Sequence, residues 1–230
     1  MIEFILESGF WALLLTLGAY QLGLFLRKKT GLAICNPLLI SAAVVIPVLL
    51  LTGLPNEGYQ KGMESISWLM TPCTVSLAIP LYTQMKLLKG KLPAVIAGAA
   101  AGALCSLLTV GLCCWALQMD NAVVISLLPK SVTTAIAMPL AENNGGIAPL
   151  TTAVVAITGV LGAVAGPFLC KLLRIQDPIA RGVAYGTSSH VIGTTRACEE
   201  SELTGAVSSL ALMVSGILTA VLFPLIVNIM

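Results

Sequence analysis

The chain has 230 residues, of which 57% are hydrophobic and 10% are charged, and its mean hydropathy is +0.98. Because a soluble domain carries about 25% charged residues, this composition indicates an integral membrane protein. A net charge of +2, from scattered basic residues, argues against nucleic-acid binding. With one histidine, and seven cysteines that form no Cys-x-x-Cys pair, the sequence predicts neither a metal site nor a cofactor.

Apolar runs of about 20 residues, the length that crosses a bilayer, divide the chain into seven or eight predicted membrane segments. The first lacks a basic n-region and is too long for a signal peptide, so we expect it to be retained. The second ends in a turn-rich stretch, 53–58. The segments are 4–26, 32–54, 65–82, 92–117, 121–141, 148–173, 178–196 and 203–229.

Three of these segments, 65–82, 121–141 and 178–196, are interrupted by proline or by polar residues. The run 74–81 aligns with 133–140, with Pro80 and Pro139 in register. A long span with glycines at the small-xxx-small spacing follows each run, Gly98 and Gly102 in one and Gly162 and Gly166 in the other. Interrupted segments at corresponding places in two repeats indicate a transporter binding site.

The sequence therefore predicts an all-α polytopic membrane protein with discontinuous or re-entrant helices and internal repeats, as in secondary transporters. We expect one domain over 1–230, with scaffold helices in 4–64 and repeats at 65–117 and 121–173. The third broken segment and the last helix occupy 178–230. The positive-inside rule places 27–29 and 86–91 in the cytoplasm, and a re-entrant 121–141 brings Lys171 and Arg174 to the same side.

The central stretch, 127–146, carries the first group of candidate site residues. Pro129 breaks the helix and Ser131 is predicted to cap the half-helix that follows, whose free N–H groups suit a carboxylate. Lys130 would add a full positive charge, and Thr133 and Thr134 would bind a hydroxyl or keto oxygen. In the alternative, Lys130 extends to the membrane surface and the threonines bond to their own helix.

The end of that stretch allows two interpretations. Glu142, Asn143 and Asn144 form either a helix cap and surface loop or a site in which Glu142 carries a proton or cation and the asparagines contact the substrate. A carboxylate near a helix C-terminus is unfavourable, so it is either solvated or buried for a purpose.

The third broken segment carries the second group. Ser188, Ser189 and Thr194 offer hydroxyls, His190 has an unperturbed pKa near neutral and could exchange a proton, and Arg196 suits a bidentate carboxylate contact. The alternative is a solvated loop, in which one of the glutamates 199, 200 and 202 pairs with Arg196. No catalytic triad or nucleophile elbow accompanies these residues, so we do not expect an enzyme.

These motifs, at 130–134, 142–144 and 189–196, resemble those of the LrgB/CidB family of bacterial membrane proteins, and the similarity covers essentially the whole chain. Val191 departs from the glycine or alanine that the family often has there. The resemblance implies a multi-pass protein of the bacterial cytoplasmic membrane. It also implies two functions: carriage of pyruvate, glycolate or glycerate, as in the related plastid glycolate/glycerate carrier, or a holin-like role in murein hydrolase export and lysis beside a small LrgA/CidA-like subunit.

The residues themselves favour a proton-coupled carrier of a small 2-hydroxy or 2-oxo acid. Selective binding needs a polar site on broken helices, whereas passive lesion formation does not. His190 or Glu142 would carry the proton, and one repeat would move against the other. The expected partners are the carboxylate, membrane lipid, and further copies of the chain or the holin-like subunit. An ion channel is the weaker alternative, because no carboxylate ring or carbonyl filter is visible.

Overall fold

The structure is a computed structural model that describes residues 10–30, 37–53, 56–69 and 90–228, with residues 72, 75, 76, 79 and 82 between them. All regular elements of these residues are helical, which confirms the predicted all-α class. The chain divides into two compact units, Met1–Ser76 and Leu77–Met230. The first copy of the predicted repeat, 74–81, lies mostly outside the described residues.

The first unit contains α2 (Phe10–Thr30), α3 (Pro37–Thr52) and α4 (Asn56–Trp68). The hydroxyls of Thr16 in α2 and Tyr59 in α4 are hydrogen-bonded at 2.8 Å, and the rings of Tyr59 and Trp11 have centroids 5.9 Å apart. The sequence predicted a turn-rich stretch at 53–58, but α4 begins at Asn56. Its polar surface hides the helix from a search for apolar runs.

The second unit contains three long helices, α7 (Leu92–Ala116), α10 (Ala148–Leu172) and α12 (Glu202–Val227). A helix of 25 residues is about 38 Å long, enough to cross a bilayer. Together with α2, they are the four helices of the described residues that are long and apolar enough to span a membrane. The protein is thus a multi-pass membrane protein, and the count of seven or eight segments stays a prediction.

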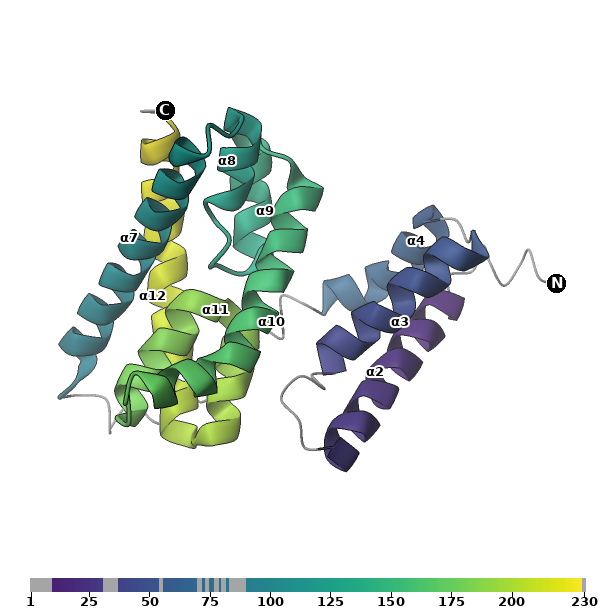
Figure 1. Cartoon of the computed structure of the whole chain (residues 1–230), viewed down its shortest axis with the longest axis horizontal. Helices are drawn as coiled ribbons and strands as arrows, with labels where there is room; N and C mark the ends of the chain where they lie inside the picture. Colours follow the sequence, from purple (N-terminus) through teal and green to yellow (C-terminus); the bar gives the residue numbers. More distant parts are fainter. Residues whose placement is uncertain are drawn as a thin grey trace. The chain divides into compact units, whose positions relative to one another are not determined.

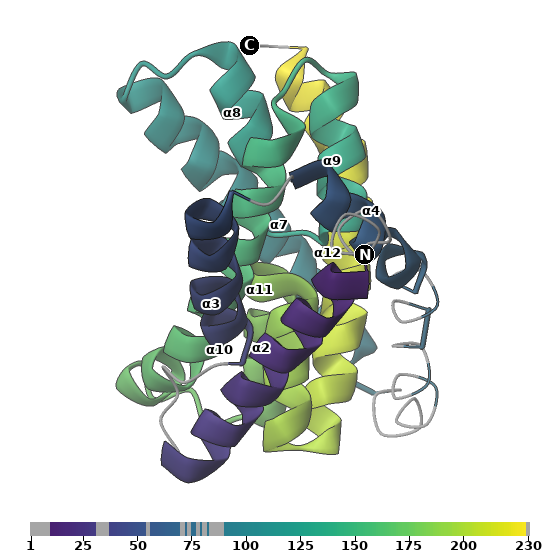
Figure 2. The same ribbon diagram turned by 90° about the vertical axis from the view of Figure 1, so that its right-hand side faces the viewer.

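Three shorter helices lie between the long ones. α8 (Asn121–Leu127) and α9 (Thr134–Asn143) lie toward one end of the unit, and α11 (Pro178–Glu200) lies toward the other (Figures 1 and 2). The Ile147 N–H donates to the Ser126 hydroxyl at 2.7 Å, so the chain that leaves α9 returns to the level of α8. The pair α8–α9 therefore enters and leaves the unit at the same end.

Helix starts in this unit follow local sequence signals. α7, α10 and α11 each have a proline in the first turn, where its missing N–H costs nothing. The Asp177 carboxylate caps α11 by accepting from the N–H groups of Ile179 and Ala180, and these bonds lower the pKa of Asp177. Ser201 caps α12 by accepting from the Thr204 N–H at 3.0 Å.

Glycines on the long helices let α11 approach closely. A Cβ at Gly102 would lie 2.9 Å from the Thr187 hydroxyl, and one at Gly98 would lie 3.2 Å from Val183. On α10, Gly162 and Gly166 lie against Ser189 and Tyr185 too closely for any side chain. Both predicted glycine pairs thus form the surface on which α11 packs.

Candidate functional site

The connection between α8 and α9 is a buried, non-helical turn. Leu128, Pro129 and Val132 are almost completely buried there. The N-cap of α9 is Thr133 rather than the predicted Ser131, and the Thr133 side chain forms no capping bond. The prediction of the cap was wrong because Ser131 is engaged elsewhere.

Ser131 links this turn to the long helix α7. Its hydroxyl lies 2.8 Å from that of Ser106, and the Lys130 ammonium donates to Ser131 at 3.3 Å. Lys130 is half-buried, and among the described residues no carboxylate forms an ion pair with it. A positive charge thus contacts the Ser131 hydroxyl, and the part of the chain that the structure describes offers it no anionic partner.

The second break lies in α11, whose backbone leaves the helical conformation at Ser189 (φ −135°, ψ 15°) and His190 (φ 41°, ψ −138°). A positive φ is unusual for a residue with a side chain. The chain reverses there, because Arg181 and Tyr185 before the break both contact Glu200 after it. We call these two halves the arms of α11, and Ser189 and His190 its tip.

The tip is buried against α10. The His190 Nε2–H donates to the carbonyl of Val155 at 2.9 Å, and the side chain is 4% exposed. This bond fixes a proton on Nε2, since a carbonyl can only accept. Gly159 lies against the imidazole and Gly162 lies against Ser189.

The α8–α9 turn and the α11 tip approach the same parts of α7 and α10. On α7, Gly102 contacts Thr187 and Ser106 contacts Ser131, one helical turn apart. On α10, Val155 packs with Val132 and accepts the bond from His190. Two polar turns from opposite ends of the unit therefore converge near its middle (Figure 1).

Other predicted site residues bond within the protein. Thr194 is buried, donates to the His190 carbonyl at 3.0 Å and contacts the Ser208 hydroxyl at 2.9 Å. Ser188 is exposed, donates to the Ala184 carbonyl at 2.7 Å and contacts Ser189 at 2.9 Å. Thr134 is half-buried as the first residue of α9.

The remaining predicted residues lie away from the two turns. Glu142 and Asn143 are exposed at the far end of α9, where the Asn144 amide donates to the Leu140 carbonyl at 2.8 Å. Arg196 lies at the base of α11 and contacts Glu199 at 2.8 Å. These positions match the predicted helix cap and the predicted arginine–glutamate pair.

Four further residues that make these contacts were not predicted from the sequence: Ser106, Ser208, Arg181 and Tyr185. Ser106 and Ser208 lie in long apolar helices, whose scattered hydroxyls form no motif. Arg181 and Tyr185 are one turn apart, a spacing that places both on one face of a helix, but their partner Glu200 is distant in sequence. Among the described residues, no group of three histidine, cysteine or acidic side chains could hold a metal ion.

This arrangement defines a multi-pass α-helical membrane protein in which polar turns meet between long apolar helices. The chain belongs to the LrgB-like family, whose model matches residues 16–229. It is similar to the antiholin-like protein LrgB of Bacillus subtilis (strain 168), with 34% identity over 222 residues and 96% of each chain covered. This confirms the resemblance seen in the sequence.

Two further relatives show the same relationship. The protein YwbG of Bacillus subtilis (strain 168) is 36% identical over 195 residues, which cover 85% of this chain and 87% of YwbG. The antiholin-like protein LrgB of Bacillus cereus (strain B4264) is 33% identical over 219 residues, with 95% of each chain covered. No solved structure matches the chain.

Proposed function

We propose that the protein carries a small monocarboxylate, such as glycolate, glycerate or pyruvate, across the bacterial cytoplasmic membrane. The observation that supports this most is the environment of Lys130, a half-buried ammonium without a carboxylate partner among the described residues. Charge inside a membrane protein is costly unless it is paired or used. A substrate carboxylate would provide the missing anion.

The Ser131 hydroxyl accepts from this ammonium and contacts the Ser106 hydroxyl, and the two hydroxyls would bind the 2-hydroxy or 2-oxo group. The free N–H groups at the start of α9, which no side chain caps, add partial positive charge to the same turn. The contacts are few, as a carrier that must release its solute requires.

His190 is the proposed proton carrier. Its Nε2–H is held by Val155, so a further proton would bind at Nδ1 and leave that bond intact. Transporters bind their solutes at interrupted segments. Two features here resemble such segments, namely the break at Ser189 and His190 and the turn between α8 and α9. In this proposal, either the α8–α9 pair or the two arms of α11 move against α7 and α10, and this movement opens the site alternately to each side of the membrane.

The basic residues support an orientation. α7 has Lys91 as its N-cap, and α10 has Lys171 in its last turn with Arg174 just after it. Both of these helix ends lie at the end of the unit where α11 begins and ends (Figure 1). At the opposite end, the described connections 117–120 and 144–147 contain no lysine or arginine. By the positive-inside rule, the base of α11 faces the cytoplasm.

A second function is favoured by the relatives, two of which are named antiholin-like. In this proposal the protein modulates a small holin-like subunit and has no solute of its own. The names of these relatives support this function more directly than they support carriage. The two differ in one requirement, because only a carrier must bind and release a solute.

The test is uptake of labelled glycolate and pyruvate into proteoliposomes, with and without a proton gradient. Lys130→Met should weaken substrate binding by about 10- to 100-fold, since a charge-assisted hydrogen bond contributes about 1.5–3 kcal/mol. Lys171→Met is the matched control, because Lys171 is exposed at the end of α10 and should leave uptake unchanged.

Saturable uptake that Lys130→Met lowers and Lys171→Met does not would support the carrier. Uptake that requires a co-reconstituted holin-like protein would make the chain one subunit of a carrier. Leakage of unrelated solutes with no saturable uptake in either format would contradict carriage and favour the antiholin-like function.

A further inference from the structure

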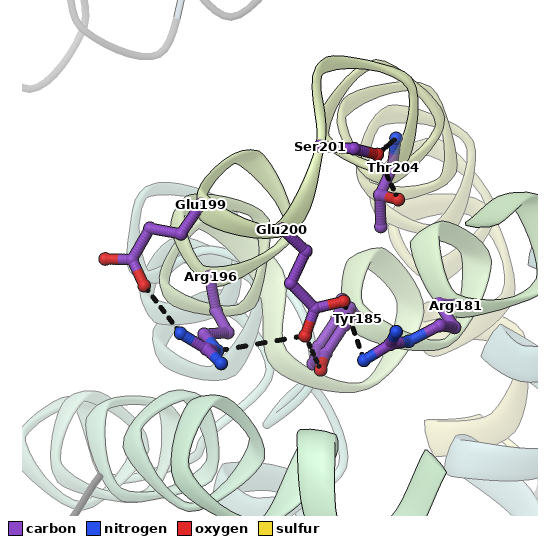
Figure 3. Close-up of polar contacts among 7 residues, drawn as sticks. All are labelled: Arg181, Tyr185, Arg196, Glu199, Glu200, Ser201 and Thr204. Atoms are coloured by element: carbon purple, nitrogen blue, oxygen red, sulfur yellow. Dashed lines mark hydrogen bonds and ion pairs between the residues drawn. The ribbon is translucent and has the colours of Figure 1, made fainter. Parts of the chain in front are cut away.

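A cluster of charged and hydrogen-bonding side chains joins the two arms of α11 at their base (Figure 3). Glu200 is its centre: Arg181 contacts Oε2 at 2.8 Å, Tyr185 donates to Oε1 at 2.8 Å, and the Nε of Arg196 lies 3.9 Å from Oε1. Arg196 also contacts Glu199 at 2.8 Å. We call these five residues the base cluster.

The base cluster holds together residues that are distant in sequence. Arg181 and Tyr185 belong to the first arm, whereas Arg196 and Glu200 belong to the second. The Glu200 side chain is 13% exposed, and the two arginines balance the two glutamates in formal charge. Removing the Glu200 charge would take from the partly buried Arg181 the carboxylate it contacts, whereas Arg196 would keep Glu199, and losing such a partly buried pair is more costly than losing a surface ion pair.

The cluster is continuous with the tip through the first arm. Tyr185 lies against Gly166, Ser189 against Gly162 and His190 against Gly159, so three successive turns of α10 receive the arm. At these three glycines, α10 has no space for a side chain. Because the contacts are this close, a small shift of the first arm at Tyr185 must also displace the tip. The second arm begins directly after His190, so the spacing of the arms at the base also constrains the break.

We propose that Glu200 is a positioning residue, which sets the place of Ser189 and His190 by locking the arms of α11 together at their base. It does not touch the solute. The inference rests on the proposed function in one respect, namely that the tip belongs to the solute site. The position of the tip itself does not depend on what the protein carries.

The experiment measures the tip directly, by electron–electron double resonance between nitroxides at positions 147 and 188. Both Ile147 and Ser188 are exposed. Ile147 lies just before α10, about 20 Å along the helix axis from Gly162, which contacts Ser189 at the tip, and such a distance suits the method. The full chain is used, with its seven cysteines replaced by alanine before Ile147→Cys and Ser188→Cys are introduced. Glu200→Gln is compared with Glu199→Gln, the neighbouring and more exposed glutamate.

Glu200→Gln should shift or broaden the distance distribution, and Glu199→Gln should leave it as in the parent. If both variants match the parent, the inference is wrong. Should Glu200→Gln not fold, Tyr185→Phe removes just one bond to Glu200 and carries the same two outcomes.

Uptake distinguishes this inference from the proposed function. If the protein is a carrier, Glu200→Gln should raise the KM for glycolate in parallel with the distance change, while Glu199→Gln leaves both unchanged. A distance change in a protein that carries no solute would contradict carriage and leave the role of Glu200 standing. If Glu200→Gln lowers uptake but leaves the distances as in the parent, the positioning role of Glu200 is contradicted and carriage is left standing.

Discussion

The contact between Gly159 and His190 allows a sharp test of the packing at the tip of α11. A Cβ at Gly159 would lie 2.5 Å from His190 Cε1, 2.6 Å from Nε2 and 2.8 Å from Ile192 Cδ1. Gly159→Ala must therefore displace the imidazole or separate α10 from α11. Such overpacking costs about 1–3 kcal/mol, and losing the bond from His190 to Val155 adds about 0.5–1.5 kcal/mol.

Gly111→Ala is the matched control within the same unit. A Cβ at Gly111, in the interior of α7, would meet one atom within 4 Å, the Cδ2 of Leu128 at 3.9 Å. That is ordinary contact, and alanine is favoured over glycine in a helix by up to about 1 kcal/mol. Gly159 also lies inside a helix, so this preference cancels in the comparison, and the two variants should differ in the free energy of unfolding by about 1.5–4.5 kcal/mol.

The assay is thermal unfolding in detergent, followed by circular dichroism and by the monodisperse fraction on gel filtration. With about 2–4 °C per kcal/mol for a chain of this size, the melting temperatures should differ by roughly 10 °C, with Gly159→Ala the lower. Equal melting temperatures for the two variants would refute the reasoning, because the added methyl group has room at Gly111 and meets the imidazole at Gly159.

Two further predictions concern α11. Thr194→Val should destabilise the protein by about 1–3 kcal/mol, because it leaves the buried Ser208 hydroxyl without its partner, whereas Thr195→Val, exposed on the same turn, should cost less than about 0.5 kcal/mol in the same unfolding assay. The cap bonds lower the pKa of Asp177 below 3.8, so the stability they provide is complete above that pH and is lost as the pH falls through the lowered pKa. Asp177→Asn, which caps at any pH, should show a smaller loss of melting temperature on acidification, and an unchanged pH profile would contradict this.

The long helices of the second unit could be predicted closely from sequence. The expected segments 92–117 and 148–173 correspond to α7 (Leu92–Ala116) and α10 (Ala148–Leu172), since apolar length and a proline in the first turn mark both. α4 could not be found this way, because it is polar. The Ser131 cap was wrong for a tertiary reason: its hydroxyl bonds to Ser106, 25 residues earlier in the chain.

Some residues of the candidate site could likewise be predicted from the sequence, and others could not. Lys130, Ser131 and His190 stood out because polar residues are rare in apolar segments, and the structure places them on two turns that approach α7 and α10. The pairing of Arg196 with a nearby glutamate was expected, but the contacts of Glu200 with Arg181 and Tyr185 were not, because they exist only once the chain reverses at Ser189 and His190. A reversal of this kind depends on the close contacts of α11 with the glycines of α10, and the sequence does not show which residues these glycines contact.

Lys130 also separates the two proposed functions through stability. A half-buried ammonium that has no carboxylate partner among the described residues weakens the fold unless something else compensates it. Methionine has a similar length and no charge, so Lys130→Met should raise the free energy of unfolding of the solute-free protein by about 0.5–2 kcal/mol. Glycolate should then stabilise the parent and not the variant, because a ligand that binds only the folded state adds RT ln(1 + [L]/Kd) to the free energy of unfolding. A variant that gains stability and loses both uptake and stabilisation by glycolate identifies a charge kept for its solute. A variant that loses stability, in a protein that glycolate does not stabilise, identifies a structural lysine and favours the antiholin-like function.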